Sequence, residues 1–142
     1  MMRSFFDTNI LVYLFDQDNP DKKKRAQNLL EREAAAGRAL LSTQVLQEFY
    51  VTVTRKIAVP IDAEEAEEAV RQLTLLPHVE VNSRHILRAI RRSGKMRLSF
   101  WDALIIEAAI EGDADTLFSE DLSDGQVIGK LTIRDPFTDP PF

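Results

Sequence analysis

Short apolar runs alternate along the chain with longer stretches in which apolar residues recur at helical spacing. The runs predict strands over residues 4–7, 39–42, 79–81, 115–119 and 131–133. The longer stretches predict helices over about residues 9–15, 20–36, 44–57, 63–76, 84–94 and 100–111. Because strands and amphipathic helices alternate, the pattern predicts a three-layer α/β/α sandwich with a central, mainly parallel sheet.

Residues that favour helix ends stand at the expected boundaries. Four helices are expected to begin at a capping residue: Asn19, Thr43, Asp62 and Ser83. The helix over residues 44–57 is expected to bury Tyr50 together with its other apolar residues. Residues 135–142 carry no pattern that predicts packing, so we expect them to form a loose tail.

The composition is typical of a single-domain protein. With 142 residues, 44% of them hydrophobic, the chain can bury one sizeable core, so residues 1–142 are expected to form one domain. No apolar run approaches the length of a membrane span and the N-terminus shows no leader pattern, which favours a soluble, cytoplasmic protein with no membrane contact. The absence of cysteine excludes disulfides and thiolate zinc sites.

The first expected strand ends in an acid, Asp7, after which the apolar period changes to that of a helix. In open α/β sheets ligands bind beyond the carboxyl ends of the strands, so this carboxylate is expected to face a site. The alternative is structural, because Asp, Thr and Asn all favour the first positions of a helix. The pattern around Asp7 is compatible with both roles.

Three further acids are expected at the same edge of the sheet: Glu48, Asp102 and Asp121. Structural alternatives exist here too, since Glu48 fits the solvated border of an apolar stripe and Asp102 fits a capping box with Ser99. Four converging carboxylates repel one another unless a cation lies among them, and oxygen ligands select Mg²⁺ or Mn²⁺. Such a site suits phosphodiester hydrolysis, because the metal activates water and neutralises charge on the phosphoryl oxygens.

The expected helix that begins near residue 84 carries a basic stripe. Residues 84–97 include six Lys or Arg residues and no acid. Four of the six fall on one helical face, opposite Ile86, Leu87 and Ile90; they are Arg84, Arg88, Arg91 and Lys95. The net charge of −5 makes such a local concentration unusual in this chain. The stripe fits a surface that follows an RNA backbone, and it also fits a solvated helix face.

Four motifs follow one another along the chain. They are Asp7-Thr8-Asn9 with the apolar run after it, Glu48-Phe49, Trp101-Asp102-Ala103-Leu104-Ile105, and Ser119-Glu120-Asp121. Together they resemble the PIN-domain nucleases and, more narrowly, the VapC-type toxins of bacterial toxin–antitoxin pairs. Residue 119 is serine where many members have threonine, which keeps the hydroxyl group.

This resemblance implies a metal-dependent endoribonuclease. Its metal-binding and catalytic residues would be Asp7, Glu48, Asp102 and Asp121, with Mg²⁺ or Mn²⁺ as the cofactor. Supporting roles are implied for four other residues: Thr8, Asn9, Ser119 and Asp124. The resemblance also implies an RNA substrate, a homodimer and a cognate antitoxin that covers the active site.

Two other classes of protein fit parts of the pattern. A PIN-like binding module that has lost catalysis would keep the fold, although the intact set of four acids favours an enzyme. An Asp-based phosphotransfer domain would use Asp7, but phosphatases of the haloacid dehalogenase type need a second Asp where this chain has Asn9. Incubation with RNA and Mn²⁺, with and without a chelator, and separately with acetyl phosphate distinguishes these classes.

Overall fold

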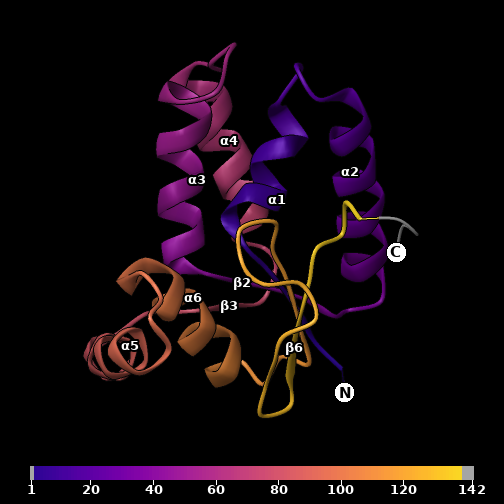
Figure 1. Ribbon diagram of the computed structural model, residues 1–142. Coiled ribbons are helices and arrows are strands. Elements are labelled where there is room, and N and C mark those ends of the chain that lie inside the picture. Colours follow the sequence, from indigo (N-terminus) through magenta and orange to yellow (C-terminus); the bar gives the residue numbers. More distant parts are fainter. Residues whose placement is uncertain (1, 139–142) are drawn as a thin grey trace.

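A six-stranded sheet forms the centre of the computed structural model, which describes residues 2–138 (Figure 1). In sheet order the strands are β3 (His78–Val79), β2 (Ala39–Ser42), β1 (Ser4–Phe6), β4 (Thr116–Phe118), β6 (Leu131–Arg134) and β5 (Val127–Ile128). All neighbouring pairs are parallel except β5 with β6. The expected mainly parallel sheet is therefore confirmed, while the two-residue strand β5 was not predicted.

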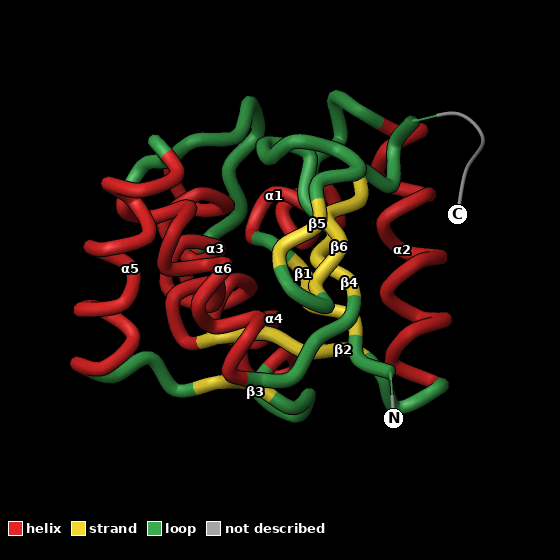
Figure 2. Tube along the Cα trace, turned by 60° about the horizontal axis from the view of Figure 1, so that its bottom comes forward, coloured by secondary structure: helices red, strands yellow, loops and turns green. Residues whose placement is uncertain are grey.

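Helices cover both faces of this sheet. The α-helices are α1 (Thr8–Val12), α2 (Pro20–Ala35), α3 (Thr43–Arg55), α4 (Ala63–Leu73), α5 (Ser83–Met96) and α6 (Phe100–Glu111), and a 3-10 turn, Tyr13–Phe15, follows α1. Figure 2 shows α2 on one side of the strands and α5 and α6 on the other. Helix α3 packs against both α1 and α4. This layering confirms the α/β/α class, and none of the described helices is both long and apolar enough to span a bilayer.

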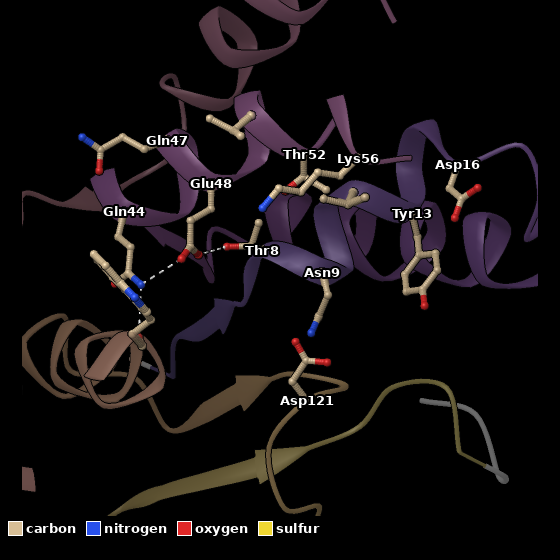
Figure 3. A pocket seen from close by; sticks show the side chains of 13 residues that line it. Thr8, Asn9, Tyr13, Asp16, Gln44, Gln47, Glu48, Thr52, Lys56 and Asp121 are labelled. Atoms are coloured by element: carbon tan, nitrogen blue, oxygen red, sulfur yellow. Dashed lines mark hydrogen bonds between the residues drawn. The ribbon is translucent and has the colours of Figure 1, made fainter. Parts of the chain in front are cut away.

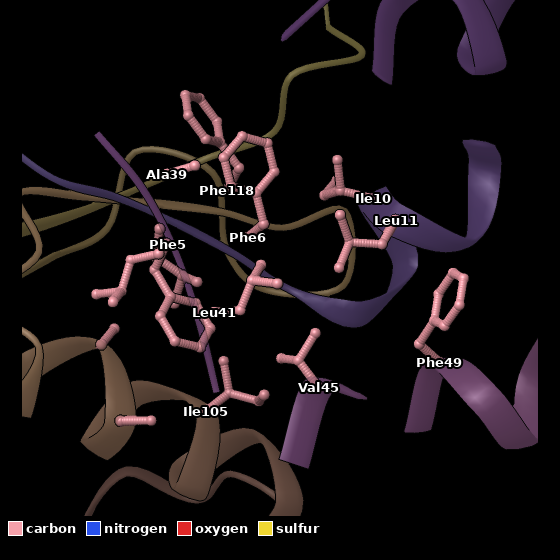
Figure 4. Close-up of a cluster of buried hydrophobic side chains, with 14 of the residues drawn as sticks. Phe5, Phe6, Ile10, Leu11, Ala39, Leu41, Val45, Phe49, Ile105 and Phe118 are labelled. Carbon is pink, nitrogen blue, oxygen red and sulfur yellow. The ribbon is translucent and has the colours of Figure 1, made fainter. Parts of the chain in front are cut away.

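The core is built around β1 and β2. The side chains of Phe5, Phe6, Leu40 and Leu41 are almost fully buried, because both faces of these strands are covered. Strands buried on both faces are continuous apolar runs in sequence, which explains why the sequence predicted them. Figure 4 shows the Phe6 ring next to that of Phe118 on β4, and their centroids are 5.4 Å apart. The carboxyl end of β1 is therefore held by well-packed neighbours.

Some expected helix caps are wrong by one residue. The Ser42 hydroxyl, and not Thr43, caps α3, and Asn82, and not Ser83, caps α5. In each case the residue before the helix has an extended backbone, so its side chain reaches the first free N–H groups. Asn19 precedes α2 as expected, but its side chain makes no capping hydrogen bond.

Two apolar surfaces on the helices are open, and the first of them was expected to be buried. Tyr50 on α3 is 39% exposed. On α5 the exposed fractions are 42%, 58% and 55% for Ile86, Leu87 and Ile90, which we call the apolar stripe. Helix α5 packs against α6 through His85 and Ala89 instead. The buried contact of α5 is therefore made by two residues with little apolar signal, while the more hydrophobic stripe stays open.

Residues 135–138 pack against the domain, which corrects the expectation of a loose tail for this part of 135–142. The Phe137 ring lies edge-on to the Tyr13 ring, with centroids 5.1 Å apart. The backbone carbonyl of Phe137 accepts a hydrogen bond from Arg25 at 3.0 Å. Apolar and polar contacts therefore hold this segment, and the remainder of the tail lies outside the described residues.

Candidate active site

Asp7 lies directly after β1 and is 5% exposed. One carboxylate oxygen accepts from the Thr8 backbone N–H at 2.7 Å, and the other accepts from the Ser119 hydroxyl at 2.7 Å. Burial is the main reason why the pKa of Asp7 is raised to about 6. The hydrogen bonds from Ser119 and Thr8 lower this pKa, whereas the charges of Asp121 and Glu48 raise it further. Asp7 thus caps α1 and is also a buried acid that other acids influence.

Glu48 projects from α3 toward α1 (Figure 3). One carboxylate oxygen accepts from the Thr8 hydroxyl at 2.7 Å, and the other accepts from the Gln44 amide at 3.3 Å. Thr8 therefore connects the two acids, since its N–H binds Asp7 and its hydroxyl binds Glu48. These bonds give Glu48 a fixed position, whereas a solvated residue at the border of the stripe would have none.

Gln44 is a site residue that the sequence did not reveal. Its side chain is 4% exposed, and the amide nitrogen donates to the Trp101 backbone carbonyl at 3.1 Å. The same nitrogen also reaches Glu48, so Gln44 connects α3 to the first turn of α6. The signal that could have identified it is a polar residue one turn before Glu48, on the buried side of an amphipathic helix.

Asp102 lies in the first turn of α6, where its backbone N–H donates to the Ser99 hydroxyl at 3.0 Å. Burial raises the pKa of Asp102 above its ordinary value, and Ser99 opposes this rise. The charges of Asp121 and Glu48 add to it, as they do at Asp7. Two acids that are far apart in sequence are therefore influenced by the same pair of neighbouring carboxylates.

The loop after β4 carries Asp121 into this neighbourhood. Ser119 is fully buried, and its hydroxyl oxygen accepts from the Asp121 N–H at 3.2 Å while its proton is donated to Asp7. The side-chain amide oxygen of Asn9 accepts from the Glu120 backbone N–H at 3.4 Å. Its buried amide nitrogen has no partner among the described residues, and Figure 3 shows it turned toward Asp121. Ser119 and Asn9 therefore position the loop relative to Asp7.

A pocket of about 740 Å³ opens between α1, α3, the start of α6 and the loop after β4. Glu48 and Asp121 line it, together with Lys56 and Trp101, two lining residues to which the sequence analysis gave no role. Asp124 does not line the pocket; its carboxylate accepts a hydrogen bond from the backbone of residue 135. The structure thus provides a recess beside the acids that is large enough for part of a polymer.

The acids have the chemistry of a cation site. Carboxylate oxygens make up the charged donors, and hard divalent ions such as Mg²⁺ and Mn²⁺ prefer oxygen donors. Burial raises the pKa of Asp7 and Asp102, repulsion from Asp121 and Glu48 raises it further, and a bound cation would relieve that repulsion. Within residues 2–138 no three or more Asp, Glu or His side chains lie in positions that could together hold a metal ion, so the fit concerns donor type and charge and not the positions of the side chains. The residues therefore fit a divalent cation by donor type and charge.

The basic stripe has an acidic neighbour on another helix, Glu111 at the end of α6. Arg84 and Arg88 lie 3.4 Å and 3.8 Å from the carboxylate of Glu111 on α6. Arg91 and Lys95 form no ion pair with any residue between 2 and 138. The charge of the stripe is therefore partly compensated at its N-terminal end and uncompensated at its C-terminal end.

Comparison with known proteins relates this geometry to a family. No curated protein matches the chain. Among solved structures, the sarcin-ricin loop cleaving toxin VapC20 of Mycobacterium tuberculosis has a TM-score of 0.61 at 17% identity, covering 83% of this chain and 89% of that one. A chain of VapBC2 from Rickettsia felis, bound to promoter DNA, has a TM-score of 0.67 at 20% identity, covering 94% of this chain and 98% of that one. A chain of DNA-bound VapBC from Salmonella typhimurium has a TM-score of 0.67 at 14% identity, covering 95% of this chain and 98% of that one. A sequence model of the PIN domain matches residues 4–123, and the chain therefore belongs to the PIN domain family.

Proposed function

We propose that this protein is a metal-dependent endoribonuclease and the toxin of a VapC-type toxin–antitoxin pair. The observation that carries the proposal is the buried Asp7 at the end of a central strand, with a pKa raised by burial and by two neighbouring acids. Membership of the PIN family supports nuclease activity, and the fold shared with a sarcin-ricin loop cleaving toxin supports RNA as the substrate. The proposed metal ligands and catalytic residues are Asp7, Glu48, Asp102 and Asp121.

Hydrogen bonds within the chain hold these acids for the reaction. Thr8 fixes Asp7 and Glu48 relative to each other, and Ser119 fixes Asp7 relative to the loop of Asp121. When bound, Mg²⁺ or Mn²⁺ would activate water and neutralise charge on the phosphoryl oxygens. The protein's own contribution is to hold carboxylates close together beside a recess that admits the substrate. Burial and mutual repulsion both disfavour the charged form of these carboxylates.

The direct test is incubation of purified protein with RNA in Mg²⁺ or Mn²⁺. We expect internal cleavage of RNA that stops when a chelator is added and resumes when metal is restored. Intact RNA under all conditions, with a correctly folded protein, would contradict the proposed activity and favour a binding module.

An antitoxin is the proposed protein partner. A nuclease that depends on converging acids can be blocked by a basic side chain that enters the pocket beside Glu48 and Asp121. The VapBC complexes that share the fold support this partner. Expression together with the neighbouring genes, followed by purification, should recover a small protein with Lys or Arg in the segment that contacts the pocket. Recovery of the chain alone, without growth inhibition, would count against it.

A homodimer is the second proposed assembly. The apolar stripe on α5 lies open in the isolated chain, and exposed apolar residues in a row favour association. We expect light scattering to give the mass of a dimer, and Leu87→Asp to give the mass of a monomer. The same mass for both proteins would show that the apolar stripe is not part of a dimer interface.

The basic stripe is proposed to bind the RNA backbone, chiefly through its C-terminal end. Four phosphate contacts with a single strand would give a slope of log affinity against log salt near −3, from about −0.7 per contact. We expect Arg91→Ala/Lys95→Ala to reduce the slope by about 1.4 in binding assays over a salt series. Arg84→Ala/Arg88→Ala is the matched control, with a smaller change because Glu111 already compensates these charges. If the slope of log affinity against log salt is unchanged in both variants, the basic stripe is only a solvated surface and does not bind RNA.

A further inference from the structure

Trp101 is an exposed aromatic ring at the edge of the active-site pocket. The residue is 60% exposed although it lies in the first turn of α6, a helix that is otherwise mostly buried. It lines the pocket with Glu48 and directly precedes Asp102 in sequence. An indole offers a large apolar face and an N–H donor, which is why Trp is enriched where ligands and partners bind, and this ring lies at a pocket.

The backbone of Trp101 is fixed relative to the acids. Its carbonyl oxygen accepts from Gln44, which also donates to Glu48. On the other side the Phe100 ring packs against the indole edge-on, with centroids 5.1 Å apart and an angle of 75° between the planes. The indole is therefore held in place next to the acids, while more than half of its surface stays accessible.

Lys56 lines the same pocket from the far end of α3. The pocket is lined along α3 by residues at helical spacing and by the residue that follows the helix: Gln44, Gln47, Glu48, Val51, Thr52 and Lys56. Figure 3 shows Glu48, Thr52 and Lys56 on the side of α3 that faces α1. At 1.5 Å per residue, the face extends about 18 Å from Gln44 to Lys56. Lys56 is the cation among the lining residues, and it forms no ion pair within the described part of the chain. An aromatic ring at one end and a free ammonium at the other suit a base and a phosphate.

We propose that single-stranded RNA lies along α3, with one base stacked on Trp101 and a backbone phosphate beside Lys56. This inference rests on the proposed ribonuclease function and adds how the substrate is held. Stacking requires an unpaired base, because the faces of bases inside a duplex are already covered. It also tolerates any base, since every base has a π-face. Trp101 and Lys56 are thus positioning residues that select single strands.

The test uses the Asp7→Asn protein, which is expected to bind RNA without cleaving it. Trp101 is the only tryptophan in the chain, so its fluorescence reports on this position alone. We expect a mixed-sequence, 12-nucleotide single-stranded RNA to quench it, and a duplex or an abasic strand of the same length to leave it nearly unchanged. Quenching that is equal for all three would overturn the stacking.

Affinity measured by anisotropy of end-labelled RNA separates the two contacts. We expect Trp101→Leu to weaken binding by about 5- to 100-fold with an unchanged salt slope, and Trp101→Phe to stay within about threefold of the Asp7→Asn protein. Lys56→Ala should reduce the salt slope by about 0.7. The matched aromatic control is Tyr50→Leu on the same helix, outside the pocket, which should bind like the Asp7→Asn protein.

Two outcomes would overturn the inference. One is unchanged RNA affinity in Trp101→Leu, which would assign the exposed ring to another ligand such as a protein partner. The other is an equal loss in Trp101→Leu and Tyr50→Leu, which would indicate a general disturbance of the surface. Neither outcome contradicts the proposed function if the parent protein cleaves RNA in Mg²⁺. If the parent protein neither binds nor cleaves RNA, the proposed ribonuclease function itself is wrong.

Discussion

Asp7→Asn is expected to abolish metal-dependent RNA cleavage, lowering kcat/KM by about a thousandfold or more. The change removes one negative charge and keeps the shape of the side chain, so the hydrogen bond from Thr8 can persist. Without metal the variant should be as stable as the parent or more so, because an ionised, buried carboxylate near Asp121 and Glu48 is lost. Cleavage rates and urea denaturation of both proteins measure the two effects.

Metal binding supplies a readout that does not depend on activity. Mg²⁺ should raise the Tm of the parent, because a ligand that binds the folded state stabilises it, and should leave Asp7→Asn nearly unchanged. Asp113→Asn is the matched control, an exposed acid away from the pocket with a left-handed backbone that asparagine accepts readily. Equal cleavage by the parent and Asp7→Asn would show that the site is wrongly placed.

Glu33→Gln is expected to lower the free energy of unfolding at pH 7 by about 2–3 kcal/mol. Glu33 is 4% exposed at the end of α2 and accepts from the Ser4 hydroxyl at 2.5 Å. Arg38 binds both of its oxygens, at 3.2 and 2.5 Å, and Arg32 approaches at 3.3 Å. These bonds join α2 to β1 and to the segment before β2, and a neutral amide cannot replace them all.

The same network predicts how stability depends on pH. The hydrogen bonds from Arg38, Ser4 and Arg32 hold the pKa of Glu33 at about 2, below the unfolded value of 4.5. Its stabilising contribution is therefore complete above pH 4.5 and is lost as the pH falls from 4.5 toward 2. Urea denaturation from pH 7 to 2 should show the stabilities of parent and Glu33→Gln converging in this range.

Glu68→Gln on α4 is the matched control for this prediction. Glu68 pairs with Arg71 on an exposed helix face, and ion pairs in solvent contribute little to stability. A loss of stability as large in Glu68→Gln as in Glu33→Gln would mean that burial does not explain the effect.

The sequence predicted the elements whose pattern has one interpretation. β1, β2 and β4 are continuous apolar runs, so the sheet and the strand-end position of Asp7 followed directly. β5 has two residues, too few to show a period. On α5 the apolar stripe lies open while a less hydrophobic face packs on α6, so hydrophobicity alone does not identify the buried face of this helix.

From the sequence we predicted the acids of the candidate site and, through the family resemblance, the polar residues Thr8, Asn9 and Ser119 beside them. Each of the acids stands at a strand end or an early helical turn, positions that carry a meaning in α/β folds. Gln44 and Trp101 could not be assigned from the sequence, because their roles come from the contact between α3 and α6. Likewise, the acid that compensates Arg84 and Arg88 is Glu111 on α6, so the net charge of the stripe depends on packing.

The two borders of the sheet limit how other chains can attach to this protein. β3 and β5 are the outer strands, and each has two residues. An incoming peptide would find few free backbone groups there, so β-augmentation offers little binding energy and edge-to-edge aggregation is discouraged. Partners must instead recognise side chains on helices, and an inhibitor that competes with such a partner should imitate a helix or a groove-filling segment.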